Sequence, residues 1–199
     1  MSRIGVFGGS FNPIHVGHAI IASSIVESGA VDALWLMVSP QNPLKENSSL
    51  ASDYHRLRMT ELVSRRLDNV ITSAFEFDLP KPSYTIDTLN TLQAKFPDDE
   101  FHLVIGADNW CLFDKWKSGE EILSKYHILI YPRLGYDIVI PEKYIDRVKV
   151  VEAPLIEVSS TQIRKRLAQL KSVSFFVPEA VEKYIVKNKL YMTIESCQR

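Results

Sequence analysis

Apolar residues follow two alternating patterns along the chain. Short apolar runs, such as RIGVF at 3–7 and ALWLMV at 33–38, predict buried strands. Longer stretches with apolar residues at helical spacing predict helices, and the first of these, at 18–29, ends at Gly29. Further strands are predicted at 69–77, 100–108, 127–133 and 148–153, and those at 100–108 and 127–133 run into loops. Further helices are predicted at 53–67, where Asp53 is the expected N-cap, at 83–96, from near Ser159, and at 178–189.

The order of these elements predicts the fold class. A strand, a loop, a helix and a second strand in succession imply a parallel pair joined by a right-handed crossover. The pattern recurs, which predicts an α/β protein with a Rossmann-like, doubly wound parallel sheet. Because no internal repeat or low-complexity linker interrupts it, we expect a single domain over 1–199, with an α/β core over about 1–157 and C-terminal helices over 158–199.

Four polar segments follow predicted strands. They are GGSFNPIHVGH at 8–18, SPQNPLKE at 39–46, GADNW at 106–110 and YPRLG at 131–135. Doubly wound sheets bind ligands beyond the carboxyl ends of their strands, where the strand order reverses. We therefore expect the functional residues to lie in these segments.

The composition narrows the class of ligand. The chain has 199 residues, 46% of them hydrophobic, which is enough to bury a core. A formal net charge of −1 provides no general basic field for nucleic acid, so a small phosphorylated ligand is the better fit. Cys111 and Cys197 lie outside any CxxC spacing, which disfavours a disulfide framework and favours the cytoplasm. No signal-peptide pattern or run of about 18 apolar residues predicts a membrane role.

Gly8 and Gly9 form a turn without side chains between the first predicted strand and helix. Backbone N–H groups there can approach an anion closely, aided by the positive end of the helix, and Ser10 adds a hydroxyl. An ordinary tight turn would also account for the glycine pair. The segment lacks both the Lys-Ser/Thr ending of a P-loop and the GxGxxG spacing of a dinucleotide fingerprint.

His15 and His18 are three residues apart, which points both rings to one side of a helix entrance. Two imidazoles there can donate hydrogen bonds to a phosphoryl group as charge builds on its oxygens. Neither needs to be a base, because an attacking phosphate is already anionic. Two alternatives stay open: a capping or core role for either ring, and a zinc site, for which no third ligand is evident and His55, His102 and His127 show no metal-like spacing.

The segment VSSTQIRKRL at 158–167 predicts a second helix start. Ser159 and Gln162 fit a capping box. The residues expected to face the core are Ile163, Leu167 and Leu170.

Ser160, Thr161 and Arg164 lie near this helix start. Two hydroxyls, a guanidinium and a helix N-terminus together suit pyrophosphate. Alone, the segment fits a well-capped surface helix equally well. Its occurrence in the same α/β chain as the glycine and histidine loop favours phosphate binding.

Two motifs carry a family resemblance. GGSFNPIHVGH resembles the HxGH signature of class I nucleotidyltransferases, and VSSTQIR at 158–164 resembles their ISSTxIR motif. Nearly the whole chain is similar to the bacterial nicotinate mononucleotide adenylyltransferases, which make deamido-NAD from ATP and nicotinate mononucleotide. PSYTIDTL at 82–89 resembles their SYTxDTL element, and GADNWCLFDKW at 106–116 resembles their GxD segment followed by Lys-Trp.

The resemblance implies a set of ATP-binding residues, with the two histidines as the catalytic pair. Asp108 is implied as a partner of the ribose or of a metal-bound water, and the β- and γ-phosphates would be held near 160–164. The full set is Gly8, Gly9, Ser10, Phe11, His15, His18, Lys45, Gly106, Asp108, Ser160, Thr161 and Arg164.

The resemblance also implies that Tyr84, Thr85 and Trp116 shape the pocket for the pyridine ring. An electron-poor ring stacks well on indole, and nearby backbone N–H groups can bind its carboxylate. Two alternatives stay open. Trp116 could pack in the core, and Tyr84 and Thr85 could simply begin a helix with Ser83 as its cap.

One segment departs from the family pattern. Many members have Pro-His-Lys after the second strand, whereas this chain has Pro43, Leu44 and Lys45. Lys45 keeps a cation for the phosphates. Leu44 removes the polar group, which puts any role of that histidine in doubt.

The implied reaction is in-line attack of the mononucleotide 5′-phosphate on the α-phosphorus of ATP. Mg²⁺ is expected as the cofactor, held mainly by phosphates and water because the chain has no acidic cluster. The rival acceptors are nicotinamide mononucleotide, phosphopantetheine and a cytidylyl-transfer substrate. A module that binds ATP without reacting is the rival from another class.

Overall fold

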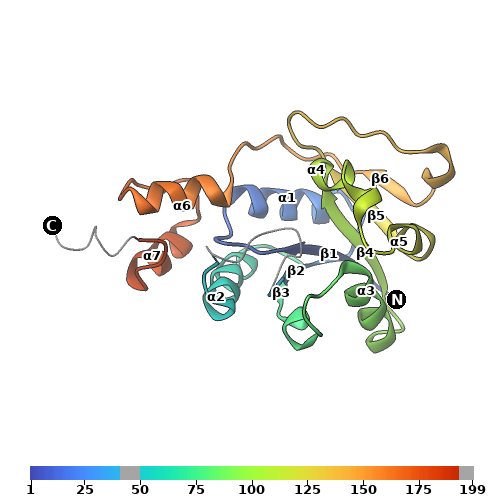
Figure 1. Ribbon diagram of the computed structural model, residues 1–199, viewed down its shortest axis with the longest axis horizontal. Coiled ribbons are helices and arrows are strands. Elements are labelled where there is room, and N and C mark those ends of the chain that lie inside the picture. Colours follow the sequence, from blue (N-terminus) through green and yellow to red (C-terminus); the bar gives the residue numbers. More distant parts are fainter. Residues whose placement is uncertain (41–49, 193–199) are drawn as a thin grey trace.

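The computed structural model describes residues 1–40 and 50–192. Six strands form one sheet in the order β3-β2-β1-β4-β5-β6, and all neighbouring strands are parallel (Figure 1). The strands are β1 (Arg3–Gly9), β2 (Ala33–Val38), β3 (Val70–Ser73), β4 (Glu100–Gly106), β5 (His127–Tyr131) and β6 (Val148–Val150). The predicted Rossmann-like, doubly wound α/β fold is confirmed.

Helices cover both faces of the sheet and enclose two cores. One core includes Ile25, Met59, Leu167 and Ile185 from four helices, and the other includes Leu89 and Ile122 from two. Within residues 1–40 and 50–192, no helix is both long and apolar enough to cross a membrane. The helices of the first core are α1 (Val16–Glu27), α2 (Asp53–Ser64), α6 (Ser160–Ala168) and α7 (Glu179–Lys187); those of the second are α3 (Thr85–Lys95) and α5 (Gly119–Lys125).

The strand order reverses between β1 and β4. From β1 the chain moves outward through α1 and α2 to β2 and β3, and it then returns through α3, on the other face, to β4. The connections that leave the carboxyl ends of β1 and β4 therefore run to opposite faces of the sheet. This divergence opens the position where doubly wound folds bind ligands.

The start of α2 differs from the prediction. Ser52, not Asp53, is the N-cap, because the Ser52 hydroxyl accepts a hydrogen bond from the His55 N–H at 3.4 Å. Asp53 lies in the first turn and pairs with Arg56 instead. The helix also ends at Ser64 rather than at residue 67.

Several other boundaries also shift. The strand predicted at 69–77 ends at Ser73, and the 3₁₀ helix η2 (Phe75–Asp78) follows it. The helix predicted at 83–96 begins at Thr85 with Tyr84 as N-cap, so Ser83 is not its cap. The strand predicted at 148–153 stops at Val150.

The predicted cap of α6 is confirmed, but one predicted core residue is wrong. The Ser159 hydroxyl accepts a hydrogen bond from the Gln162 N–H at 3.2 Å, and Ile163 and Leu167 are buried. Leu170 is 59% exposed, because α6 ends at Ala168 and the helical spacing no longer applies beyond it.

The contrast between Ile163 and Leu170 gives a stability prediction. We expect Ile163→Ala to lower the free energy of unfolding by about 2–4 kcal/mol, because it removes a buried side chain and leaves a cavity. Leu170→Ala, the matched control, should change it by less than about 0.5 kcal/mol. Urea unfolding of both variants measures the difference. Equal losses would contradict the docking of α6 on the core.

Candidate active site

The loop at residues 10–15 joins β1 to α1 at the reversal of strand order. Phe11 is buried, with φ at 42°, and its ring lies over Gly9. A Cβ on Gly9 would approach that ring to 3.0 Å, so any other residue there would require the ring to shift. Within the described residues, the N–H groups of Ser10 and Phe11 make no hydrogen bond. Both donors can therefore serve an anion.

Gly8 lies beside open space at the carboxyl end of β1. The residue is exposed, and a Cβ added to it would meet no atom of residues 1–40 and 50–192 within 4 Å. It therefore leaves room for a ligand to pass across the strand end.

The two predicted histidines meet at the start of α1. His15 is the N-cap, and its ring stacks on that of His18 with the centroids 3.7 Å apart. The His15 main-chain N–H donates to His18 Nδ1 at 3.2 Å, and the ring of Phe11 packs edge-on against His18 at 5.0 Å. Because His18 Nδ1 accepts this hydrogen bond, the proton of the neutral ring is on Nε2, which can donate to a phosphoryl oxygen.

His15 is held in its neutral form. Burial lowers the pKa of the His15 ring to about 3, and the positive charge of Arg133 lowers this pKa as well. His15 Nδ1 is buried, has no hydrogen-bond partner of standard geometry among the residues that the structure describes, and faces the first turn of α1. Near neutral pH, His15 therefore acts as an uncharged imidazole rather than as a cation.

Residues from α6 reach the same loop. Ser160 Oγ donates to the Pro13 carbonyl at 2.9 Å, and Arg164 Nη1 donates to the Asn12 carbonyl at 2.9 Å. Arg164 Nη2 also donates to Thr161 Oγ1 at 3.3 Å. The two motifs, separated by about 150 residues in the sequence, therefore form one structure. The phosphate-binding roles of Ser160, Thr161 and Arg164 stay a prediction.

Arg56, which the sequence reasoning missed, supports the loop through hydrogen bonds to backbone carbonyls. This side chain is fully buried, and its guanidinium donates to the carbonyls of Ser10 at 2.8 Å, Ser39 at 2.7 Å and Ala51 at 3.1 Å. A signal was available. Three buried residues of α2 follow Arg56 by three, four and seven positions, so Arg56 lies on the buried face of the helix. An arginine on a buried face needs hydrogen-bond partners inside the fold. Those residues are Met59, Thr60 and Val63.

Asp108 and Arg133 meet beyond the ends of β4 and β5. Arg133 Nε lies 3.3 Å from Asp108 Oδ1, and Arg133 Nη2 donates to the Tyr131 hydroxyl at 3.4 Å. Asp108 Oδ1 is buried but makes no hydrogen bond of good geometry within the described residues. Gly106 is required because a Cβ there would overlap Asp108 Oδ1 and approach Tyr131 to 3.0 Å. The sequence reasoning assigned no role to Arg133.

The predicted pyridine-pocket residues lie with the core on the other face of the sheet. Tyr84 caps α3 and Thr85 begins it, while Lys117 Nζ lies 4.2 Å from the centre of the Tyr84 ring. Trp116 stacks on Phe113 at 5.2 Å, and its buried Nε1 has no hydrogen-bond partner within residues 1–40 and 50–192. Trp116 thus has a packing role and also an N–H donor available to a ligand. Trp116 and the pair formed by Tyr84 and Thr85 all lie toward the carboxyl edge of the sheet.

Two predictions remain: the role of Lys45 near the phosphates, and the alternative of a metal site at the histidine pair. Lys45 and Leu44 lie outside the described residues. In the described part, no group of three or more His, Cys, Asp and Glu residues can hold a metal ion. His15 and His18 stack face to face, an arrangement that does not direct their lone pairs at a common ion.

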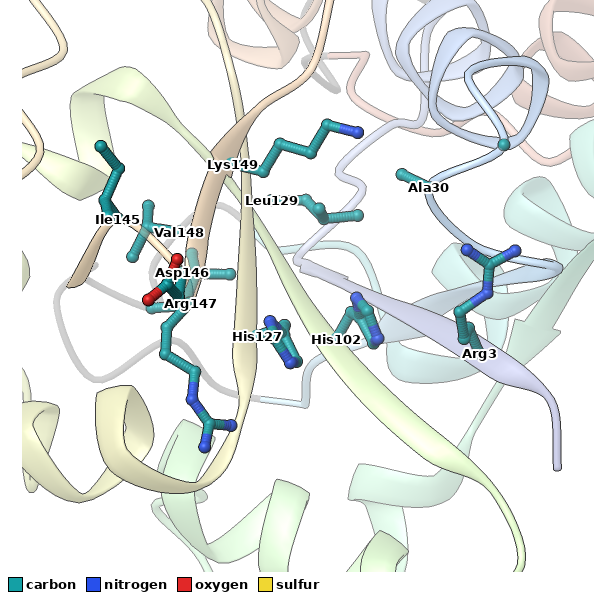
Figure 2. A pocket seen from close by; sticks show the side chains of 12 residues that line it. Arg3, Ala30, His102, His127, Leu129, Ile145, Asp146, Arg147, Val148 and Lys149 are labelled. Carbon is teal, nitrogen blue, oxygen red and sulfur yellow. The ribbon is translucent and has the colours of Figure 1, made fainter.

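A hollow of about 290 Å³ lies at the opposite edge of the sheet, at the amino ends of the strands (Figure 2). The rings of His102 and His127 stack there at 5.1 Å, and their Nε2 atoms lie 3.0 and 3.6 Å from Glu100 Oε1. None of the predicted site residues lines this hollow, so it is separate from the carboxyl-edge site. Its charged lining residues are Arg3, Asp146, Arg147 and Lys149.

Comparison with known proteins is consistent with this geometry. A cytidylyltransferase-like family model matches residues 6–166. A "Probable nicotinate-nucleotide adenylyltransferase" of Bacteroides fragilis is 43% identical over 186 residues, with 94% of this chain and 92% of that protein covered. A protein of the same name from Flavobacterium psychrophilum is 41% identical, with 95% and 98% covered.

Solved structures share the fold. The Plasmodium falciparum nicotinic acid mononucleotide adenylyltransferase complexed with NaAD superposes with a TM-score of 0.79 at 20% sequence identity, covering 96% of this chain and 98% of that one. The same enzyme complexed with APC gives a TM-score of 0.78 over the same shares.

The two glycines before the loop give opposite predictions. Gly8→Val should fold as stably as the unmodified protein but bind ATP at least about tenfold more weakly, because its side chain fills the space beside the strand end. Gly9→Ala should instead lose stability, since the Phe11 ring has to move. Calorimetric titration with a non-hydrolysable ATP analogue and thermal unfolding separate the two effects. Unchanged affinity in Gly8→Val would mean that the nucleotide does not pass over Gly8.

Proposed function

Because the chain belongs to the cytidylyltransferase-like family and, within it, to the nicotinate-nucleotide adenylyltransferases, we propose that it transfers the adenylyl group of ATP to nicotinate mononucleotide. The products are deamido-NAD and pyrophosphate. The observation that supports this most directly is the joining of the histidine pair, Ser160 and Arg164 through one loop at the carboxyl edge of the sheet.

The reaction is a direct in-line displacement. A 5′-phosphate oxygen of nicotinate mononucleotide attacks the α-phosphorus of ATP, and the bond to the bridging oxygen of pyrophosphate breaks. His18 Nε2–H donates to an α-phosphoryl oxygen as negative charge builds there, and the neutral His15 ring acts beside it. The attacking phosphate is already ionised, so no general base is required, and catalysis consists of positioning and charge stabilisation.

The nucleotide lies along the glycine loop and the ends of β1 and β4. The N–H groups of Ser10 and Phe11 serve its phosphates, and Gly8 and Gly9 allow the close approach. Gly106 and Asp108 lie against the nucleoside. Thr161 and the Arg164 N–H groups that do not bond to the loop hold the leaving pyrophosphate. Ser160 lies at the same end of the nucleotide and bonds to the loop.

The pyridine ring lies in the pocket formed by Tyr84, Thr85 and Trp116. Indole provides a flat stacking surface, and the buried Trp116 Nε1–H is a donor in need of an acceptor. The N–H groups in the first turn of α3, at Thr85, suit the ring carboxylate because helix N-termini favour anions.

Nucleotidyltransferases of this kind generally use a divalent metal, and we propose Mg²⁺ for this chain. The donor set fits, because Mg²⁺ retains several waters and binds through substrate phosphates with few protein ligands. The buried Asp108 Oδ1 lacks a hydrogen bond within the described residues and can accept one from a metal-bound water. When bound, the ion neutralises phosphate charge. We propose the cytoplasm as the location, where the exposed Cys111 thiol stays reduced.

The choice of acceptor is tested with purified protein, ATP and Mg²⁺. We expect pyrophosphate release with nicotinate mononucleotide, and a kcat/KM at least about tenfold higher than with nicotinamide mononucleotide, since the carboxylate adds a charge-assisted contact. A preference for the amide would overturn the assigned acceptor. Binding of ATP without release of pyrophosphate in the presence of either acceptor would indicate a module that binds nucleotide without reacting.

His18 is tested by its removal. His18→Ala should bind ATP nearly as well as the unmodified protein but turn over on the order of 100-fold more slowly, because the lost donor acts mainly in the transition state. His127→Ala, at the opposite edge of the sheet, is the matched control and should keep its activity. Single-turnover rates measure both variants, and a His18→Ala rate within a few-fold of normal would exclude His18 from the reaction.

A further inference from the structure

The Asn12 side chain joins three separate parts of the chain at the centre of the loop. Asn12 is buried, and its Oδ1 accepts hydrogen bonds from the Ala51 N–H at 3.0 Å and from the Tyr191 hydroxyl at 2.8 Å. A backbone N–H can only donate, so the atom facing Ala51 is the amide oxygen. The Tyr191 hydroxyl is therefore the donor to Asn12.

The chain beyond α7 turns back to bring Tyr191 to this position. Lys189 and Tyr191 have φ values of 51° and 64°, in the left-handed region that large side chains seldom adopt. The Leu190 N–H donates to the Ile185 carbonyl at 3.0 Å, which closes the turn after the helix. Burial raises the pKa of the Tyr191 hydroxyl, which keeps its proton. A strained backbone that places one hydroxyl on the active-site loop indicates a local constraint.

The loop depends on donors from outside itself. The carbonyls of Ser10, Asn12 and Pro13 each accept from a different side chain, provided by α2 and α6. Tyr191 adds a contact to the Asn12 side chain, three residues before His15, beside the one from the Ala51 N–H. Loss of its hydroxyl would remove one of two donors to a buried amide oxygen, and a shift of the loop would be one way to relieve this.

We infer that Tyr191 is a positioning residue for the adenylyl transfer proposed above, and that its hydroxyl acts through Asn12 on the geometry of the histidine loop. The C-terminal turn is thereby part of the active site. A small displacement of the histidine donors weakens interactions made in the transition state more than those of bound substrate. The effect of losing the hydroxyl therefore falls on kcat rather than on KM.

The experiment compares Tyr191→Phe with Tyr184→Phe. Tyr184 belongs to α7, and its hydroxyl bonds to His55 Nδ1 at 2.9 Å, away from the loop. Both variants should lose a similar, small part of their thermal stability. Tyr191→Phe should show a kcat about tenfold lower with both KM values within about twofold, whereas Tyr184→Phe should keep its kcat. Equal kcat values in Tyr191→Phe and the unmodified protein would overturn the inference.

A double-mutant cycle tests the route of the effect. In an Asn12→Ala background, Tyr191→Phe should lower kcat no further, because the partner of the hydroxyl is already gone. Independent, additive losses would overturn the route through Asn12.

Amide hydrogen exchange separates this inference from the proposed function. Exchange in residues 10–18 should speed up about tenfold in Tyr191→Phe but not in Tyr184→Phe, whatever reaction the protein performs. An unmodified protein inactive with nicotinate mononucleotide, combined with this faster exchange, would reject the acceptor and keep the positioning role. Unchanged exchange in Tyr191→Phe would reject the positioning role.

Discussion

The structure depends on a buried arginine at the carboxyl edge of the sheet. Burying a guanidinium is costly unless its nitrogens find acceptors. Arg56 meets this requirement with three carbonyls and the carboxylate of Asp53, which is partly exposed and connects the cluster to solvent. The carbonyls belong to the segments that follow β1 and β2 and to the chain entering α2. One side chain thus fixes three chain segments where the sheet alone no longer holds them.

On this base, the loop presents donors rather than acceptors to a ligand. A carbonyl oxygen facing a polyphosphate would repel it, so an anion site has to turn its carbonyls away. Here the carbonyls of Ser10, Asn12 and Pro13 are occupied from behind by Arg56, Arg164 and Ser160. The same arrangement explains why the two sequence motifs lie together: the C-terminal motif supports the N-terminal one directly. The uncharged His15 ring suits such a site, because burial disfavours its charged form and a neutral imidazole can still donate a hydrogen bond.

Local patterns predicted much of this architecture because they reflect local physics. Runs of apolar residues identified the strands, helical spacing identified most helices, and their order predicted the parallel sheet. The histidine pair and Arg164 were found from their spacing at two predicted helix starts and from the family motifs that these segments resemble. Ser52 displaced Asp53 as N-cap because either residue can cap a helix, and only tertiary contacts decide between them.

Leu170 was misplaced because the end of α6 is not marked by glycine or proline. Helical spacing places Arg56 on the buried face of α2, but no local pattern identifies its partner 46 residues away, or the partner of Tyr191, 179 residues away. The division into an α/β core and C-terminal helices stays a prediction.

The two halves of the site lie on opposite faces of one sheet, and this imposes a requirement on the strand ends between them. A ligand that contacts the histidine pair on the α1 side and Trp116 on the α3 side has to cross the ends of β1 and β4. At these ends the chain has Gly8, beside open space, and Gly106, where a side chain would displace Asp108. Glycine at both positions therefore allows a ligand to cross the strand ends. Gly8 leaves space for the ligand, and Gly106 allows the Asp108 carboxylate to approach it. A dinucleotide-shaped product, with a base at each end and phosphates between, matches this arrangement of two groups of side chains on opposite faces of the sheet with unpaired backbone N–H groups at the strand ends.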